Sequence, residues 1–249
     1  MKGASRINKQ IRKNIARLTD DRRDKSAVVS NMIVMIMVIF IAITIPFSAL
    51  SISANLVFKN QDLYGFEFER SGMISTINGD ISPAEMATQM VNFLSGKDDY
   101  IKAKASYSET YSDIFSDEDM EDLKTFRQFL DRILVFAIIF LIISAILFAM
   151  LFVAERKREL RKAFSAGGVV YIILVIVSIL FAFAEVFREF VLKLMFGIVH
   201  ASNSMIPIIF TGYYRAMAVG LIAIVAFIIF AIIYTIGSRF FKEHRMFEI

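Results

Sequence analysis

The composition of this 249-residue chain is too apolar for a soluble domain: 57% of its residues are hydrophobic and its mean hydropathy is +0.60, more than a globular core of this length can bury. The chain has no cysteine, which excludes disulfides, a thiolate nucleophile and a cysteine-based metal site. Its net charge of +4 is interpreted as the sum of a basic and an acidic membrane face, not as a signal for nucleic acid.

Four stretches without Asp, Glu, Lys or Arg are each at least 22 residues long. A helix of about 22 residues reaches roughly 33 Å, enough for a hydrocarbon core of about 30 Å, and it satisfies its own backbone in lipid. The first stretch is longer than needed, so we expect its end, Pro46 to Phe58, to continue outward or to kink. We predict an all-α membrane protein with four transmembrane helices, the first an uncleaved anchor, at 26–58, 131–154, 164–187 and 215–238.

The distribution of Lys and Arg predicts the orientation of the chain. Residues 1–25 hold nine basic residues against three Asp, and the short loop 155–163 holds five. The connection 59–132 holds eight basic and fifteen acidic residues, which gives 8 − 15 = −7. By the positive-inside rule, the tails 1–25 and 239–249 and the loop 155–163 are cytoplasmic, and the segments 59–130 and 188–214 are extracytoplasmic.

The extracytoplasmic segment 59–130 is expected to be mainly helical. Within it, "ISPAEMATQMVNFLSG" (residues 81–96) is typical of a capped helix, with Ser82 as N-cap, Pro83 in the first position, Glu85 in a capping box and Gly96 at the end. A segment of about 70 residues is too small to hold a core alone. We therefore expect it to pack against the membrane helices.

Six acids crowd the start of the second membrane helix in "FSDEDMEDLKTFRQFLDRILVF", residues 115–136. Ser116 is the expected N-cap, which places Asp117 and Asp119 at the positive end of the helix dipole. Capping alone would account for these acids. The alternative is a functional site, because Asp119 and Asp122 are expected to lie near one another on one face of the helix.

Further polar residues surround the end of the third membrane helix. Charges at the edge of a span are costly and either neutralise one another or serve a function; here Glu185, Arg188, Glu189 and Lys193 fall on one stripe. His200 follows, one of only two histidines. After it, polar residues cluster before the last span, at Asn203, Ser204, Thr211, Tyr213, Tyr214 and Arg215.

Four segments carry a resemblance to a known family: "VNFLSG", "FSDEDMEDLK", "FVLKLMFGIVH" and "SMIPIIFTGYYRAM". Their order resembles the lipoprotein intramolecular transacylase (Lit) family of small bacterial four-span proteins. That family typically has His-Met-x-Asp-Val-Lys at the start of the second span and a second histidine after the third. Met120, Asp122 and Lys124 follow the motif, His200 falls on the second histidine, and Asp119 stands where the first histidine is usual.

The resemblance implies an enzyme that moves an acyl chain from the diacylglyceryl group of a lipoprotein to the α-amino group of its own N-terminal cysteine. Such a reaction needs a base and donors for an oxyanion. The resemblance then makes His200 the base, makes Asp119 or Asp122 the partner of the ammonium or the imidazole, and assigns substrate binding to Lys124, Arg188, Tyr213 and Arg215. The expected partners are membrane lipid, a diacylglyceryl lipoprotein and other membrane proteins of a Gram-positive cell, with no cofactor, metal or nucleic acid.

Two other interpretations remain open. Asp has a reference pKa of about 3.9, too low for a base unless its environment raises it, so a chain with Asp119 in place of histidine could instead be a non-catalytic relative. Such a relative would bind a lipid or lipidated ligand, or serve as a subunit of a membrane complex. A metal-dependent hydrolase using Asp117, Asp119, Asp122 and His200 is less favoured, because acids on one helix turn are poor evidence without a second histidine.

Overall fold

The computed structural model describes residues 2–72, 74, 81–102, 104–107, 110–186 and 210–241, with side chains described from residue 29 onward outside 103–113 and 240–241. The described chain forms α1 (Lys2–Phe58), α2 (Gln61–Ser71), α4 (Pro83–Leu94), α5 (Asp117–Val153), α6 (Lys157–Phe183) and α9 (Gly212–Phe241). A short antiparallel hairpin, β1 (Lys104–Tyr107) and β2 (Thr110–Asp113), was not expected from the sequence.

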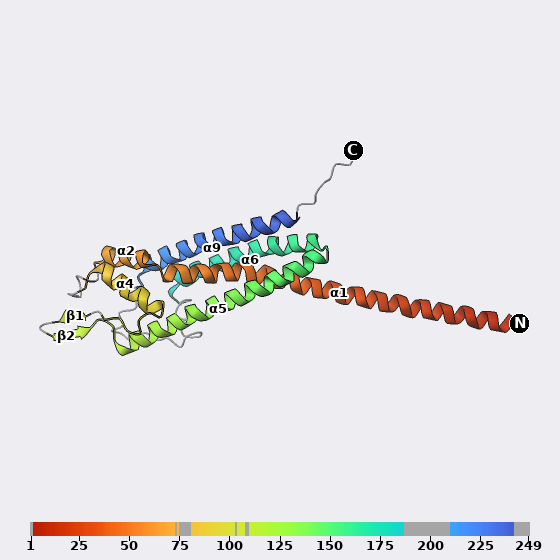
Figure 1. Ribbon diagram of the computed structural model, residues 1–249, viewed down its shortest axis with the longest axis horizontal. Coiled ribbons are helices and arrows are strands. Elements are labelled where there is room, and N and C mark those ends of the chain that lie inside the picture. Colours follow the sequence, from red (N-terminus) through yellow and green to blue (C-terminus); the bar gives the residue numbers. More distant parts are fainter. Residues whose placement is uncertain are drawn as a thin grey trace, which may run out of the picture.

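Four helices are long and apolar enough to cross a membrane, over Val29–Phe58, Asp117–Val153, Lys157–Phe183 and Gly212–Arg239. This confirms the predicted four-span helical class. Figure 1 shows the four side by side, with α2, α4 and the hairpin gathered at one end of the bundle. We call these three elements the head unit. The start of α1 and the end of α9 both lie toward the opposite end (Figure 1).

Helix α1 is the central helix of the bundle, packing against α5, α6 and α9, and its apolar segment is the most buried of the four. It meets α5 along what we call the polar seam. There the Thr44 and Ser144 hydroxyls lie 2.6 Å apart, Ser48 Oγ donates to the Ala137 carbonyl at 3.0 Å, and Asn55 Nδ2 donates to the Leu130 carbonyl at 2.9 Å. Small and hydroxyl side chains are typical of contacts between membrane helices.

Pro46 lies inside α1, which nevertheless continues to Phe58. Because proline has no N–H, the carbonyl of Ala42 loses its usual helical donor. Gly167 of α6 packs directly at that carbonyl, since a Cβ on Gly167 would stand only 3.4 Å from the Ala42 oxygen and 3.6 Å from Phe230 Cε2. The glycine lets the two backbones approach closely, a geometry that favours weak Cα–H···O contacts.

Among the residues that the structure describes, the head unit forms no core separate from the bundle, as expected from its size. Its buried side chains share one cluster with the ends of the membrane helices, including Tyr64 and Phe68 of α2, Met90 and Phe93 of α4, Val57 of α1, Leu123 of α5 and Tyr214 of α9. Three of the predicted signals of α4 are present: Ser82 Oγ accepts from the Glu85 N–H at 3.2 Å, Pro83 is the first residue, and Gly96 has a φ of 75°. The head unit therefore depends on the bundle for its stability.

The contact at Gly167 leads to a first prediction. Gly167→Val should lower the free energy of unfolding by about 1–3 kcal/mol, because the added atoms overpack against the Ala42 carbonyl and Phe230. Gly168→Val is the matched control, since a Cβ at Gly168 meets no atom within 4 Å. Thermal unfolding in detergent would measure both variants. Equal melting temperatures for the two would contradict the tight α1–α6 contact.

Candidate functional site

The acidic start of α5 is built around a capping box. Ser116 Oγ accepts from the Asp119 N–H at 3.1 Å, and Asp119 Oδ2 accepts from the Ser116 N–H at 3.3 Å. These reciprocal bonds satisfy donors that a helix start otherwise leaves unpaired. Asp119 is only 2% exposed, so its carboxylate is part of the fold. Asp122 is half-buried and Lys124 is exposed.

Lys124 lines a cleft of about 520 Å³ between the end of α4 and the first turns of α5. Phe93 and Met120, both buried, contribute to its lining. Arg127 holds the neighbouring loop, because its Nη1 donates to the Phe93 carbonyl at 3.2 Å and to the Asp98 carbonyl at 3.3 Å. The cleft is thus preformed, and Lys124 faces the α4 side of α5.

A second polar group joins α2 to the start of α9; the sequence analysis named Thr211 and Tyr213 but not its two α2 members, Glu67 and Arg70. Its centre is Glu67, which is 1% exposed. Arg70 donates to this carboxylate from Nε at 3.0 Å and from Nη2 at 2.7 Å, and Thr211 Oγ1 donates to it at 2.6 Å. Arg70 Cζ lies 4.1 Å from the ring centroid of Tyr213. We call Glu67, Arg70, Thr211 and Tyr213 the Glu67 cluster.

Four of the polar residues named before the last span, Thr211, Tyr213, Tyr214 and Arg215, are described at the start of α9, whereas Asn203 and Ser204 lie outside the described residues. Thr211 Oγ1 accepts from the Tyr214 N–H at 3.1 Å, which caps α9. Arg215 Nη1 donates to the Phe210 carbonyl at 2.7 Å. The ring centroids of Tyr214 and Tyr64 lie 5.5 Å apart, and the Tyr64 hydroxyl donates to the Phe58 carbonyl at 3.0 Å. Burial raises the pKa of Tyr64, which keeps this phenol protonated.

Aromatic contacts connect the two polar groups. Phe126 of α5 contacts Phe210 with ring centroids 6.2 Å apart, and Phe210 contacts Tyr214 at 5.2 Å. The first turns of α5 and the start of α9 therefore meet at the head end of the bundle.

Two predicted site residues, Arg188 and His200, lie outside the described residues. Within the described part of the chain, no three acidic or histidine side chains form a group suited to a metal ion.

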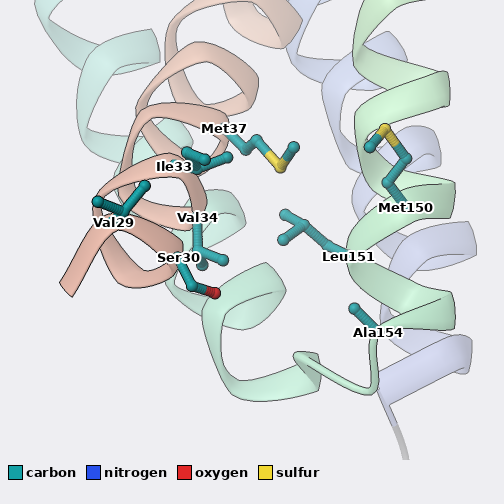
Figure 2. Close-up of a pocket in the computed structure, with 8 residues that line it drawn as sticks. All are labelled: Val29, Ser30, Ile33, Val34, Met37, Met150, Leu151 and Ala154. Carbon is teal, nitrogen blue, oxygen red and sulfur yellow. The ribbon is translucent and has the colours of Figure 1, made fainter. Parts of the chain in front are cut away.

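An apolar groove of about 550 Å³ lies at the other end of the bundle, between α1 and α5. Figure 2 shows Met37 and Leu151 facing one another across it, with Ser30 as the single polar residue among those labelled. The groove lies on membrane-spanning helices far along α5 from Asp119, and it brings no acid or base to its surface. We therefore place the candidate site at the head end.

Sequence reasoning missed Glu67 because its burial depends on a partner 144 residues away, Thr211. The only local signal is the spacing of Glu67 and Arg70 at i and i+3 on a short helix flanked by Tyr64 and Phe68. Such a pair is usually a solvated surface contact. The spacing of Leu63, Tyr64 and Phe68 places Glu67 on the apolar face of α2 and Glu69 outside it, but this pattern does not identify the partner of Glu67.

Four spanning helices and a small head unit, with the buried carboxylates of Glu67 and Asp119 where the two meet, define a polytopic helical membrane protein. A family model described as lipoprotein intramolecular transacylase Lit matches residues 36–197. The chain therefore belongs to the Lit family, as the sequence resemblance predicted. No curated protein matches the chain.

Solved structures support the same fold. The membrane integral lipoprotein intramolecular transacylase Lit from Bacillus cereus is 17% identical, with a TM-score of 0.63 over 87% of this chain and 100% of that one. Its variant with one histidine replaced by arginine is 15% identical, with a TM-score of 0.65 over 90% of this chain and 98% of the other. At 15% to 17% sequence identity, these structures show that the fold is similar and nothing more.

A second prediction tests the role of Asp119. Asp119→Ala should lower the free energy of unfolding by about 1 kcal/mol, because the Ser116 N–H loses its acceptor. Asp119→Asn keeps an acceptor oxygen and should be close to wild type in stability. Asp117→Ala, on the exposed face of the same turn, is the control. Chemical denaturation in detergent would compare them, and an Asp119→Ala variant as stable as wild type would contradict the capping role.

Proposed function

We propose that the chain transfers an acyl chain within bacterial lipoproteins at the extracytoplasmic face of the membrane. The observation that carries this proposal is membership of the Lit family across residues 36–197. In the reaction, the α-amino nitrogen of the N-terminal cysteine attacks an ester carbonyl of the diacylglyceryl group. A C–N bond forms and the C–O bond breaks, and the proton lost by the nitrogen passes through a base to the departing oxygen. The products are an N-acyl chain and a lyso-glyceryl group.

The proposed roles follow the chemistry of each side chain. His200 is the base, because an imidazole titrates near neutral pH. Asp119 or Asp122 binds the ammonium or orients the imidazole, and Lys124, Arg188, Tyr213 and Arg215 bind the substrate or the developing oxyanion. The position of Tyr213 and Arg215 in the first turn of α9 supports this assignment. A lipid ester lies at the edge of the hydrocarbon, which is where a spanning helix begins.

The burial of Asp119 favours a second candidate function. This residue stands where the family usually carries histidine, and it is engaged in a capping box. A carboxylate committed to a helix start is poorly suited to act as a base. The alternative is a non-catalytic relative that binds a lipid or lipidated ligand, or that serves as a subunit of a membrane complex.

The proposed orientation gives a third prediction. Both termini are proposed to be cytoplasmic and the head unit extracytoplasmic, since the basic residues concentrate in 1–25 and 155–163. Because the chain has no cysteine, single cysteines at Asp99 and Arg158, both exposed, report topology directly. An impermeant thiol reagent should label intact cells only through the Asp99→Cys variant. Labelling of the Arg158→Cys variant instead would show that the chain has the opposite orientation.

A fourth prediction tests the activity. Expression of the chain in a host without other transacylases should convert lipoproteins to the lyso form, detected by mass spectrometry of their N-terminal peptides. His200→Ala should reduce that product on the order of 10²–10⁴-fold, the usual contribution of a general base, at an unchanged protein level. The control is His244→Ala, at the other histidine.

The outcomes separate the two functions. Full activity in the His200→Ala variant would contradict the role of His200 as the base, but the proposed transacylase activity would still stand. A lipoprotein profile that the wild-type chain does not alter would instead favour the non-catalytic relative.

A further inference from the structure

The Glu67 cluster contains a pair whose two charges are buried very unequally. The Glu67 side chain is 1% exposed, whereas that of Arg70 is 38% exposed. A buried carboxylate is costly unless donors surround it. Glu67 has such donors: Arg70 reaches both of its oxygens through Nη2, at 2.7 and 2.9 Å, and Thr211 donates at 2.6 Å. Hydrogen bonding to Glu67 also raises the pKa of Arg70, so the guanidinium stays charged.

Two hydrogen bonds link α2 to Thr211 before the start of α9: the Thr211 hydroxyl donates to Glu67 at 2.6 Å and accepts from Arg70 Nη2 at 3.5 Å. Thr211 donates its hydroxyl hydrogen to Glu67 and accepts from the Tyr214 N–H with the same oxygen. The rotation of the first turn of α9 is thereby linked to α2. The negative carboxylate also lies at the positive end of the α9 dipole, where it is favoured. The bond between Thr211 and Glu67 is charge-assisted and therefore stronger than a neutral one.

Tyr213 is held from the other side by Arg70. The guanidinium carbon lies 4.1 Å from the ring centroid of Tyr213, a cation–π contact, and the Phe66 ring lies 6.3 Å away. Tyr213 is nevertheless 50% exposed, so its outer face is open to a ligand. Glu67 thus acts on Tyr213 by two routes, through the backbone at Thr211 and through the side chain of Arg70.

We infer that Glu67 is a positioning residue, which fixes the ring of Tyr213 at the membrane edge for contact with the lipidated substrate. This inference rests on the proposed acyl transfer for its catalytic consequence and on the contacts of the Glu67 cluster for its structural one. A buried ion pair is weak as a device for stability, because an apolar side chain of similar volume often serves the fold as well. What an apolar side chain cannot do is orient a guanidinium and a hydroxyl at once.

The decisive variant is therefore Glu67→Met, which keeps the side-chain volume and removes the carboxylate that binds both Arg70 and Thr211. Glu69→Met is the matched control, because Glu69 lies on the same helix and is exposed. Glu67→Gln is a second variant that retains an acceptor for Thr211 and loses only the charge. All three would be made in the full chain, and the melting temperature in detergent would identify any variant that fails to fold.

Two measurements follow, one of them independent of activity. The first is the rate of lyso-lipoprotein formation across substrate concentrations: Glu67→Met should lower kcat on the order of tenfold to a hundredfold, with a smaller loss in Glu67→Gln and none in Glu69→Met. The second is fluorine NMR of a 3-fluorotyrosine placed only at Tyr213. Its resonance should shift or broaden in Glu67→Met and match wild type in Glu69→Met.

The two measurements keep the two proposals apart. If the wild-type chain makes no lyso-lipoprotein, the proposed function fails, and the fluorine resonance alone decides the role of Glu67. An unchanged resonance at Tyr213 in a folded Glu67→Met variant would overturn the inference, whatever the rate. A changed resonance with wild-type kcat would overturn its catalytic part.

Discussion

The packing of α1 against the other three membrane helices is the constraint on which the rest of the structure depends. In lipid no hydrophobic force draws helices together, so the helices associate through close van der Waals packing and hydrogen bonds. The polar seam supplies the bonds to α5, and Gly167 allows the approach of α6 at the carbonyl that Pro46 leaves without a donor. The bond from Asn55 to the Leu130 carbonyl fixes the axial position of α5 relative to α1. It thereby fixes the position of the acidic start of α5 relative to the end of α1.

The same aromatic contacts hold both the head unit and the candidate site in place. The aromatic contacts from Phe58 through Phe126 and Phe210 to Tyr214 join the ends of α1, α5 and α9. The head unit closes over this cluster with α2 and α4. The polar groups of the site therefore lie on the rim of an aromatic core, where low polarity strengthens each hydrogen bond. The site is held by the same contacts that hold the head unit to the bundle.

The sequence predicted the features that depend on local chemistry. The spans follow from hydropathy, and Ser82 and Ser116 cap helices because their side chains reach nearby N–H groups. Asp119 was expected to be either a cap or a site residue, since the same carboxylate suits both. The contacts of the Glu67 cluster with Thr211 and those of the polar seam could not be predicted, because each depends on a partner 75 or more residues away. Polar side chains within an apolar stretch give no local sign of the face they meet.

The polar seam also bears on how the protein assembles. Helix α1 precedes its partners in the chain, and Leu130 lies 75 residues beyond Asn55, a delay of roughly 4–15 s at ribosomal speed. During that interval Thr44, Ser51 and Ser53 can bond to carbonyls of their own helix, as they do in the finished bundle. The Asn55 side chain, in contrast, bonds to α5. Until α5 is inserted, the Asn55 amide therefore lacks the backbone acceptor that it has in the finished bundle.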